Sequence, residues 1–205
     1  ADFLWKQQIR KKSYIQAGVK YTYTDMKDNA HYEGLTPAKE WTSIPVYDYS
    51  LDYQEDIGAL YTTYASDRKQ WSFHIGLRVE YTRTTDRSNH LKRRYWDWFP
   101  HIDLSYAFDP VRQWLLIGQY ARNIERPAFS TLNPNRIQTS EYTYQIGNPA
   151  LHPTYIHRFS TTLVHNYHYT LTIGGNLHRD LIREFGKQDA ENSDISYITY
   201  ENHYR

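Results

Sequence analysis

The chain has 205 residues, of which 40% are hydrophobic, and its 24 lysines and arginines nearly balance 23 aspartates and glutamates, for a net charge of +1. Such a balance provides no bulk attraction for nucleic acid, which is therefore not expected as a partner. The 21 tyrosines, six tryptophans and seven phenylalanines exclude a disordered chain. The lack of cysteine excludes disulfides, thiolate metal sites and cysteine nucleophiles.

Extended structure is expected along the whole chain. Residues 1–14 lack a basic stretch followed by an apolar core, so no secretory signal is expected there. No apolar run approaches the roughly 18 residues of a transmembrane helix, and no long helical period occurs. Alternating apolar and polar residues predict strands, in chain order, over 3–10, 12–24, 47–66, 71–82, 98–108, 113–123, 154–166, 169–182 and 195–204.

The length of these strands distinguishes two classes of β protein. Strands of soluble sheets usually span about five or six residues, whereas a tilted strand that crosses a bilayer needs about nine to eleven. Most of the predicted strands reach the longer range. The alternative is a soluble β-sandwich with the aromatic residues in its core, because alternation alone does not separate the two.

Two predicted strands, 71–82 and 98–108, divide their side chains between an apolar and a polar face. The apolar face is predicted to meet lipid and comprises Trp71, Phe73, Ile75, Leu77, Val79, Tyr81, Ile102, Leu104, Tyr106 and Phe108. The polar face is predicted to line the lumen and comprises His74, Arg78, Glu80, His101 and Asp103. Lumen charges commonly pair across strands, so we expect an ion-pair ladder here rather than a catalytic group.

The connections alternate in length along the chain. Short ones are predicted at 67–70, 109–112 and 166–168, and long ones at 25–46, 83–94, 124–152 and 184–194. Short periplasmic turns and long extracellular loops are typical of outer-membrane barrels. The one basic cluster, 86–94, falls in a long connection, where a solvated surface is expected.

Candidate chemistry is sparse. Among the ten histidines, His165 and His168 flank a short turn, and His152 and His157 surround a strand start. Neither pair has a third ligand at a motif spacing, so no metal and no cofactor is expected. There is no phosphate-binding loop, no serine-nucleophile motif and no paired-histidine protease motif, so we do not expect an enzyme.

The connection after residue 122 contains the most specific sequence motifs. They are Asn-Ile-Glu-Arg-Pro at 123–127, Leu-Asn-Pro at 132–134 and Gly-Asn-Pro-Ala-Leu-His-Pro at 147–153. Together with Gly-Leu-Arg-Val-Glu-Tyr-Thr at 76–82, they resemble the outer-membrane β-barrel family found in TonB-dependent-receptor-like proteins of Bacteroidota. The resemblance is best over 47–183.

The matching loop residues are Arg126, Pro127, Leu132, Asn133, Pro134, Gly147, Asn148, Pro149, Leu151 and Pro153. Asn123, Asn135 and Thr154 depart from the family pattern. Proline stiffens a loop, and glycine and asparagine accept turn conformations. We therefore favour a role in shaping a loop at the barrel rim over direct contact with a ligand.

The resemblance implies an all-β fold, an antiparallel transmembrane β-barrel in the outer membrane of a Gram-negative bacterium. Residues 1–205 would be a single barrel segment without a plug domain, the C-terminal portion of a barrel of about 22 strands. The implied function is energised uptake of a nutrient: a metal chelate, a glycan or a peptide. The implied partners are outer-membrane lipid, a surface lipoprotein, and the TonB system through a plug domain outside this chain.

Two alternatives remain open at this point. About eight strands can be counted, which is enough for a small barrel that closes on itself. The second alternative is a soluble all-β module that binds carbohydrate or protein through exposed aromatic rings.

Overall fold

The computed structural model describes residues 1–45, 48–88, 90–190 and 192–203. The parts of the predicted segments that fall on residues 46, 47, 89, 191 and 204 lie outside this description. The main feature is one antiparallel sheet in which the strands follow each other in chain order. Its eight strands are β1 (Asp2–Arg10), β2 (Ser13–Ala30), β5 (Tyr49–Arg68), β6 (Trp71–Asp86), β7 (Leu91–Ala107), β8 (Trp114–Glu125), β11 (Thr154–His165) and β12 (Tyr169–Arg179).

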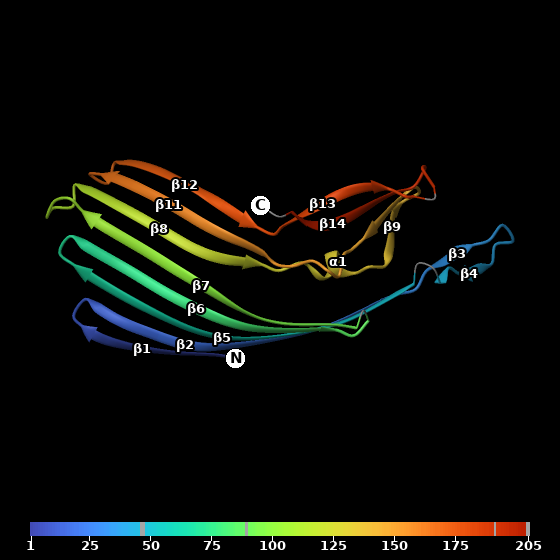
Figure 1. The fold of residues 1–205 in the computed structure, drawn as a ribbon, viewed down its shortest axis with the longest axis horizontal. Coiled ribbons are helices and arrows are strands. Elements are labelled where there is room, and N and C mark those ends of the chain that lie inside the picture. The colour runs from blue at the N-terminus through green and yellow to red at the C-terminus, as the bar shows by residue number, and fades with distance from the viewer. Residues whose placement is uncertain (46–47, 89, 191, 204–205) are drawn as a thin grey trace.

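The sheet is a curved wall with two edges. Figure 1 shows the eight strands as a bent layer that runs from β1 at one side to β12 at the other. Among the described residues no pairing joins β1 to β12, so this sheet does not close on itself. The all-β, antiparallel prediction is confirmed, and the count of about 22 strands stays a prediction.

The register of β6 and β7 keeps the two predicted faces apart. Phe73 lies opposite Leu104 and Ile75 opposite Ile102 on one face, whereas His74 lies opposite Asp103 on the other. A slip of one residue would exchange the faces, so this register matters. Ile75 and Leu104 keep 43% and 41% of their surface exposed. A sandwich core would instead bury such side chains against a second sheet.

Three of the predicted long connections contain further structure. Between β2 and β5, strands β3 (Glu33–Leu35) and β4 (Trp41–Ser43) form a hairpin. A second sheet has the strand order β13-β14-β10-β9, with β10 and β14 parallel. Its members, together with a short helix, are α1 (Phe129–Leu132), β9 (Arg136–Ser140), β10 (Thr143–Ile146), β13 (Leu181–Gln188) and β14 (Ser196–His203). In the described residues we find no helix long and apolar enough to cross a membrane.

The prediction of a long connection over 83–94 is wrong. Strand β6 continues to Asp86 and β7 already begins at Leu91. Thr84 lies opposite Arg93 in the ladder, and the side chains of Thr84 and Asp86 are buried. The apolar alternation stops near residue 82 although the strand does not, because above this level polar side chains occupy both faces.

The predicted end of the strand 98–108 also needs correction. Strand β7 ends at Ala107, so Phe108 is not a strand residue. The backbone N–H of Phe108 donates to the carbonyl oxygen of Trp114 at 3.0 Å, which places it in the turn to β8. The short turns themselves occur where they were predicted. In one of them, the carboxylate of Asp109 accepts bonds from the backbone N–H groups of Gln113 and Trp114, each at 3.0 Å.

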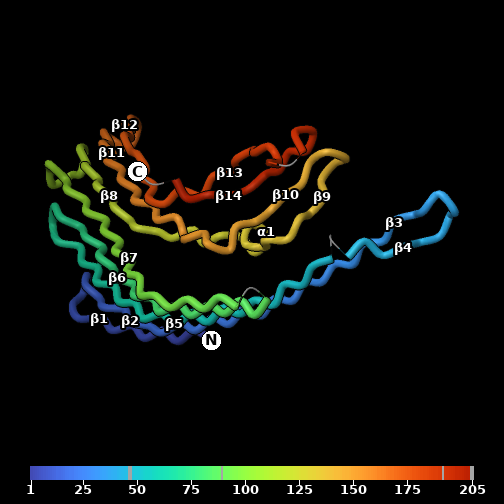
Figure 2. The backbone as a smooth tube through the Cα atoms, turned by 45° about the vertical axis from the view of Figure 1, so that its right-hand side comes forward, coloured from blue at the N-terminus to red at the C-terminus, as the bar shows by residue number. Residues whose placement is uncertain are grey.

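The buried core lies between the wall and the connection that leads from β8 to β11. Figures 1 and 2 both show α1 between the ends of β5 to β7 and the pair β13 and β14. Leu51 and Tyr53 of β5 form a buried cluster with Leu132 and Leu151 of the connection. The connection is thus part of the core and not a solvated loop.

Candidate functional site at the inward-folded loop

Residues 126–153, here called the motif loop, leave the sheet directly after β8 and return at β11. The two halves of the loop are bonded to each other. Gly147 N–H donates to the Asn133 oxygen and Asn148 N–H to the Thr131 oxygen, each at 2.7 Å. A Cβ at residue 147 would lie 2.7 Å from the Asn133 nitrogen, so only glycine fits this approach. This contact explains why the Leu-Asn-Pro and Gly-Asn-Pro motifs occur together in the sequence.

Arg126 fastens the start of the motif loop to the face of the sheet that carries Glu80, here called the inner face. Its Nη2 lies 2.7 Å from Glu80 Oε2 and 3.1 Å from Thr82 Oγ1, and its Nε lies 3.8 Å from Glu55 Oε2. The Glu80 side chain is only 4% exposed and also pairs with Arg78. A buried carboxylate of this kind is costly without a cationic partner. Arg126, the arginine of the Arg-Pro motif, therefore compensates the charge of the buried Glu80.

Arg93 of β7 holds the end of the motif loop. Its guanidinium donates hydrogen bonds to the carbonyl oxygens of Pro149 and Leu151. Leu151 is completely buried. The sequence placed Arg93 in a solvated basic cluster, and this expectation is wrong for that residue. Its position in the strand could have predicted this, because Arg93 falls on the same side of the period-two alternation as Tyr95 and Asp97, which lie on the inner face.

Thr154, which departs from the family pattern, is almost fully buried where β11 meets the second sheet. Its hydroxyl donates to the carbonyl oxygen of Asp180 and accepts from the N–H of Ile182, both at 3.1 Å. Asp180 itself has a left-handed backbone, with φ at 59°. Thr154 thus fixes the bend at which β12 passes into β13.

Arg122 fills the place where β7 and β8 separate. These strands are hydrogen-bonded only near the turn that joins them, where residues 101–107 pair with residues 115–121. Beyond this paired stretch, the guanidinium of Arg122 donates to the Trp98 carbonyl oxygen at 2.9 Å and lies 3.9 Å from Asp97. The same group lies over the rings of Phe99 and Tyr155, 5.9 and 4.5 Å from their centroids. Phe99, an aromatic side chain on the polar face of β7, thus has a cationic partner.

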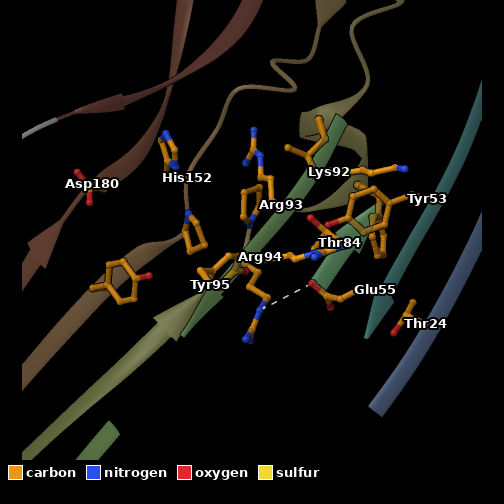
Figure 3. Close-up of a pocket in the computed structure, with 16 residues that line it drawn as sticks. Thr24, Tyr53, Glu55, Thr84, Lys92, Arg93, Arg94, Tyr95, His152 and Asp180 are labelled. Atoms are coloured by element: carbon orange, nitrogen blue, oxygen red, sulfur yellow. Dashed lines mark ion pairs between the residues drawn. The ribbon is translucent and has the colours of Figure 1, made fainter. Parts of the chain in front are cut away.

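A cavity of about 700 Å³ opens between the motif loop and the inner face. Figure 3 shows Tyr53, Glu55 and Thr84 on one side of it and His152 and Asp180 on the other. The lining residues include four basic ones, Lys92, Arg93, Arg94 and Arg126, but only two acidic ones, Glu55 and Asp180. Of the basic residues on β7, Arg93 shares the inner face, whereas Lys92 and Arg94 alternate to the other face at the border of the cavity. The cavity therefore carries a positive surplus and is suited to anionic groups.

The predicted site residues fall into three groups. On the face predicted to meet lipid, Trp71, Ile75, Leu77, Leu104 and Phe108 are exposed, and Phe73, Val79, Tyr81, Ile102 and Tyr106 are partly exposed. On the face predicted to line the lumen, Glu80 is buried, His101 is exposed, and His74, Arg78 and Asp103 are in between. None of the ten residues named for the motif loop is exposed. The assignments to lipid and lumen remain predictions.

The histidine pairs considered for metal binding do not acquire a third ligand in the described residues. The structure instead brings together His74, His101 and Asp103, which the sequence placed on one face without a metal role. Their contact depends on the register of β6 and β7, which alternation alone does not fix.

The sequence was compared with known proteins. The model of the outer membrane protein beta-barrel family matches residues 2–205, which is nearly the whole chain. No curated protein matches the chain closely enough to count as a relative. The curved antiparallel wall, its uncovered apolar face and its polar inner face agree with this family. The chain belongs to the outer membrane protein beta-barrel family, and its location is the cell outer membrane.

Proposed function

We propose that this chain forms the wall and rim of a TonB-dependent-receptor-like transporter of the Bacteroidota type, which takes up a nutrient with energy supplied by the TonB system. Family membership supports a barrel in the outer membrane. The sequence motifs of the motif loop support the narrower assignment to TonB-dependent-receptor-like proteins. The proposal is a transporter and not an enzyme, and the outer-membrane location removes the reason to prefer a soluble binding module.

The observation that carries the proposal is the cavity under the motif loop. A loop that folds inward and is fastened at both ends, by Arg126 and Arg93, would narrow the lumen of the proposed barrel. The cavity of about 700 Å³ falls in the size range of small-molecule sites. The surplus of basic residues around it favours a substrate that carries carboxylates, such as a metal chelate or an acidic peptide, over a neutral glycan.

The remaining parts of the transporter follow from the same proposal. A plug domain outside this chain would contact the inner face and connect to TonB. A surface lipoprotein would cover the rim at the β3–β4 hairpin and the second sheet. Outer-membrane lipid would surround the apolar face.

Uptake by cells tests the proposal. A strain that lacks the gene is complemented with the full-length protein, and uptake of a panel of labelled chelates, peptides and glycans is measured. We expect at least one anionic nutrient to depend on the protein, and its uptake to stop when the proton gradient is collapsed. Uptake that is unchanged for the whole panel, or that continues without the gradient, would contradict the proposal.

The cavity is tested by reversing charge. Lys92 and Arg94 border it on β7, flanking the inward-facing Arg93, and have no carboxylate partner among the described residues. We expect the double variant Lys92→Glu and Arg94→Glu to slow uptake of the anionic nutrient about tenfold or more, as loss of electrostatic attraction does. The control is the double variant Lys11→Glu and Lys12→Glu, because both lysines are exposed at the opposite end of the strands and the net charge changes by the same amount. An equal effect of both changes would show that only overall charge matters.

A further inference from the structure

A group of three metal-ligating side chains lies on the inner face, away from the motif loop. His74 of β6 lies directly opposite Asp103 of β7, and His101 lies opposite Gly76. Gly76 has no side chain, so the ring of His101 can lean across toward β6. Period-two alternation then points all three side chains to the same side of the sheet.

The donor atoms of these residues are close to the spacing that a metal ion requires. His101 Nε2 and His74 Nδ1 lie 2.8 and 3.3 Å from the same oxygen, Asp103 Oδ2, and all three donors lie within 4.8 Å of one another. Ligands at about 2.1 Å from a tetrahedral ion are about 3.4 Å apart. Small rotations of the two imidazoles therefore suffice to place the three donors around one ion.

A neighbouring chain of hydrogen bonds fixes the carboxylate. Gln119 Nε2 donates to Asp103 Oδ1 at 2.9 Å, and Ser160 Oγ lies 3.1 Å from Gln119 Oε1. One carboxylate oxygen is thus held by β8 and β11, while the other is directed at the two histidines. Support of this kind is a regular feature of metal sites in proteins, because it orients the ligand.

The site is accessible from solvent. The side chains of His74 and His101 are 42% and 46% exposed, and that of Asp103 is 25% exposed. His101 and Asp103 line a hollow of about 450 Å³, so an ion and its remaining water ligands have room. Arg158 lines the same hollow and is the charge that opposes a cation there.

We infer that His74, His101 and Asp103 form a binding site for one divalent transition-metal ion on the inner face of the wall. Two imidazoles and one carboxylate suit zinc, copper, nickel and ferrous iron and disfavour magnesium and calcium. The inference concerns binding alone. Its failure would leave the proposed uptake function intact, and failure of uptake would leave the site intact.

Titration of the purified protein with Zn²⁺ tests the inference. The full-length protein in detergent is first treated with a chelator, and heat-modified gel mobility confirms that the barrel is folded. We expect one strong Zn²⁺ site by calorimetry. His74→Ala and His101→Ala should each weaken it more than tenfold, and Gln119→Leu should weaken it by about ten- to a hundredfold through loss of orientation. The control is His168→Ala, since His168 is exposed in the β11–β12 turn.

The wild-type protein supplies an independent measurement if a variant does not fold. Cu²⁺ bound at the site should give an electron paramagnetic resonance spectrum with coupling to two imidazole nitrogens. Absence of a strong site in the wild type, its persistence in His74→Ala or His101→Ala, or a copper spectrum without this coupling would overturn the inference.

Discussion

At the scale of single residues, the interior of this wall is organised by arginines that cross from one segment to another. Arg126 reaches from the motif loop to Glu80, Arg93 reaches from β7 to the loop backbone, and Arg122 fills the gap between two strands. Arginine suits this task because its planar group offers five donors and stays charged. The loop is therefore held by polar contacts as well as by its small apolar cluster.

The contribution of Arg126 can be measured by removing it. We expect Arg126→Ala to lower the free energy of unfolding by about 2–3 kcal/mol, because Glu80 stays buried and, among the described residues, keeps only Arg78 as a cationic partner. Unfolding by denaturant in lipid vesicles gives the value. The matched control is Arg136→Ala, whose exposed pair with Asp189 is worth less than about 1 kcal/mol. Equal losses in the two variants would refute the anchoring role.

At the scale of elements, the base of the β3–β4 hairpin contains a hydrogen-bonded histidine and aspartate pair whose charge state depends on pH. At its base, His31 Nδ1 and the Tyr32 N–H each lie 2.8 Å from the carboxylate of Asp48. The hydrogen bond to Asp48 raises the pKa of His31 above its usual 6.5. The pKa of Asp48 lies below its usual 3.8, mainly because the backbone N–H of Tyr32 donates to its carboxylate and secondly because of the hydrogen bond with His31.

These two shifts define a pH window for the hairpin base. Because the pKa of His31 is raised, its hydrogen bond to Asp48 stabilises the folded hairpin base fully below pH 6.5, and this stabilisation is lost as the pH rises through the raised pKa. Because the pKa of Asp48 is lowered, its carboxylate stabilises the folded hairpin base fully above pH 3.8, and this stabilisation is lost as the pH falls through the lowered pKa. The base should therefore be most ordered between these limits.

Nuclear magnetic resonance titration of the His31 ring checks this account. We expect its midpoint above 6.5 in the wild type and a return toward 6.5 in Asp48→Asn. Glu33→Gln is the control, because Glu33 is a smaller cause of the shift. A midpoint in Asp48→Asn that equals the wild-type value would contradict the assignment.

The elements also show how far the sequence could predict the structure. The two faces of β6 follow from local alternation, so the side on which Ile75 or His74 lies could be predicted. Strand β10 could not, because it pairs in parallel with β14, about 50 residues later. The same holds for Arg126 and Glu80, whose contact depends on the path of the motif loop. The metal-ligating group needed the register of β6 and β7 as well as the alternation.

At the scale of the whole molecule, the chain is a curved wall with one apolar and one polar surface. Strands β1 and β12 each pair with one neighbour in the eight-stranded sheet, so each presents a free edge among the described residues. Exposed edges of long strands are prone to pair with other chains. A closed barrel requires either that β1 and β12 pair with each other or that further strands join them.

The central claim is that this wall separates lipid from water, and labelling along β7 tests it most directly. The chain has no cysteine, so single cysteines can be introduced at 102 to 106 and spin-labelled in lipid vesicles. We predict that labels at Ile102, Leu104 and Tyr106 are relaxed by oxygen dissolved in the bilayer. Labels at Asp103 and Ser105 should instead be relaxed by a water-soluble chromium complex. Equal accessibility at all five positions, or the reverse alternation, would contradict the account.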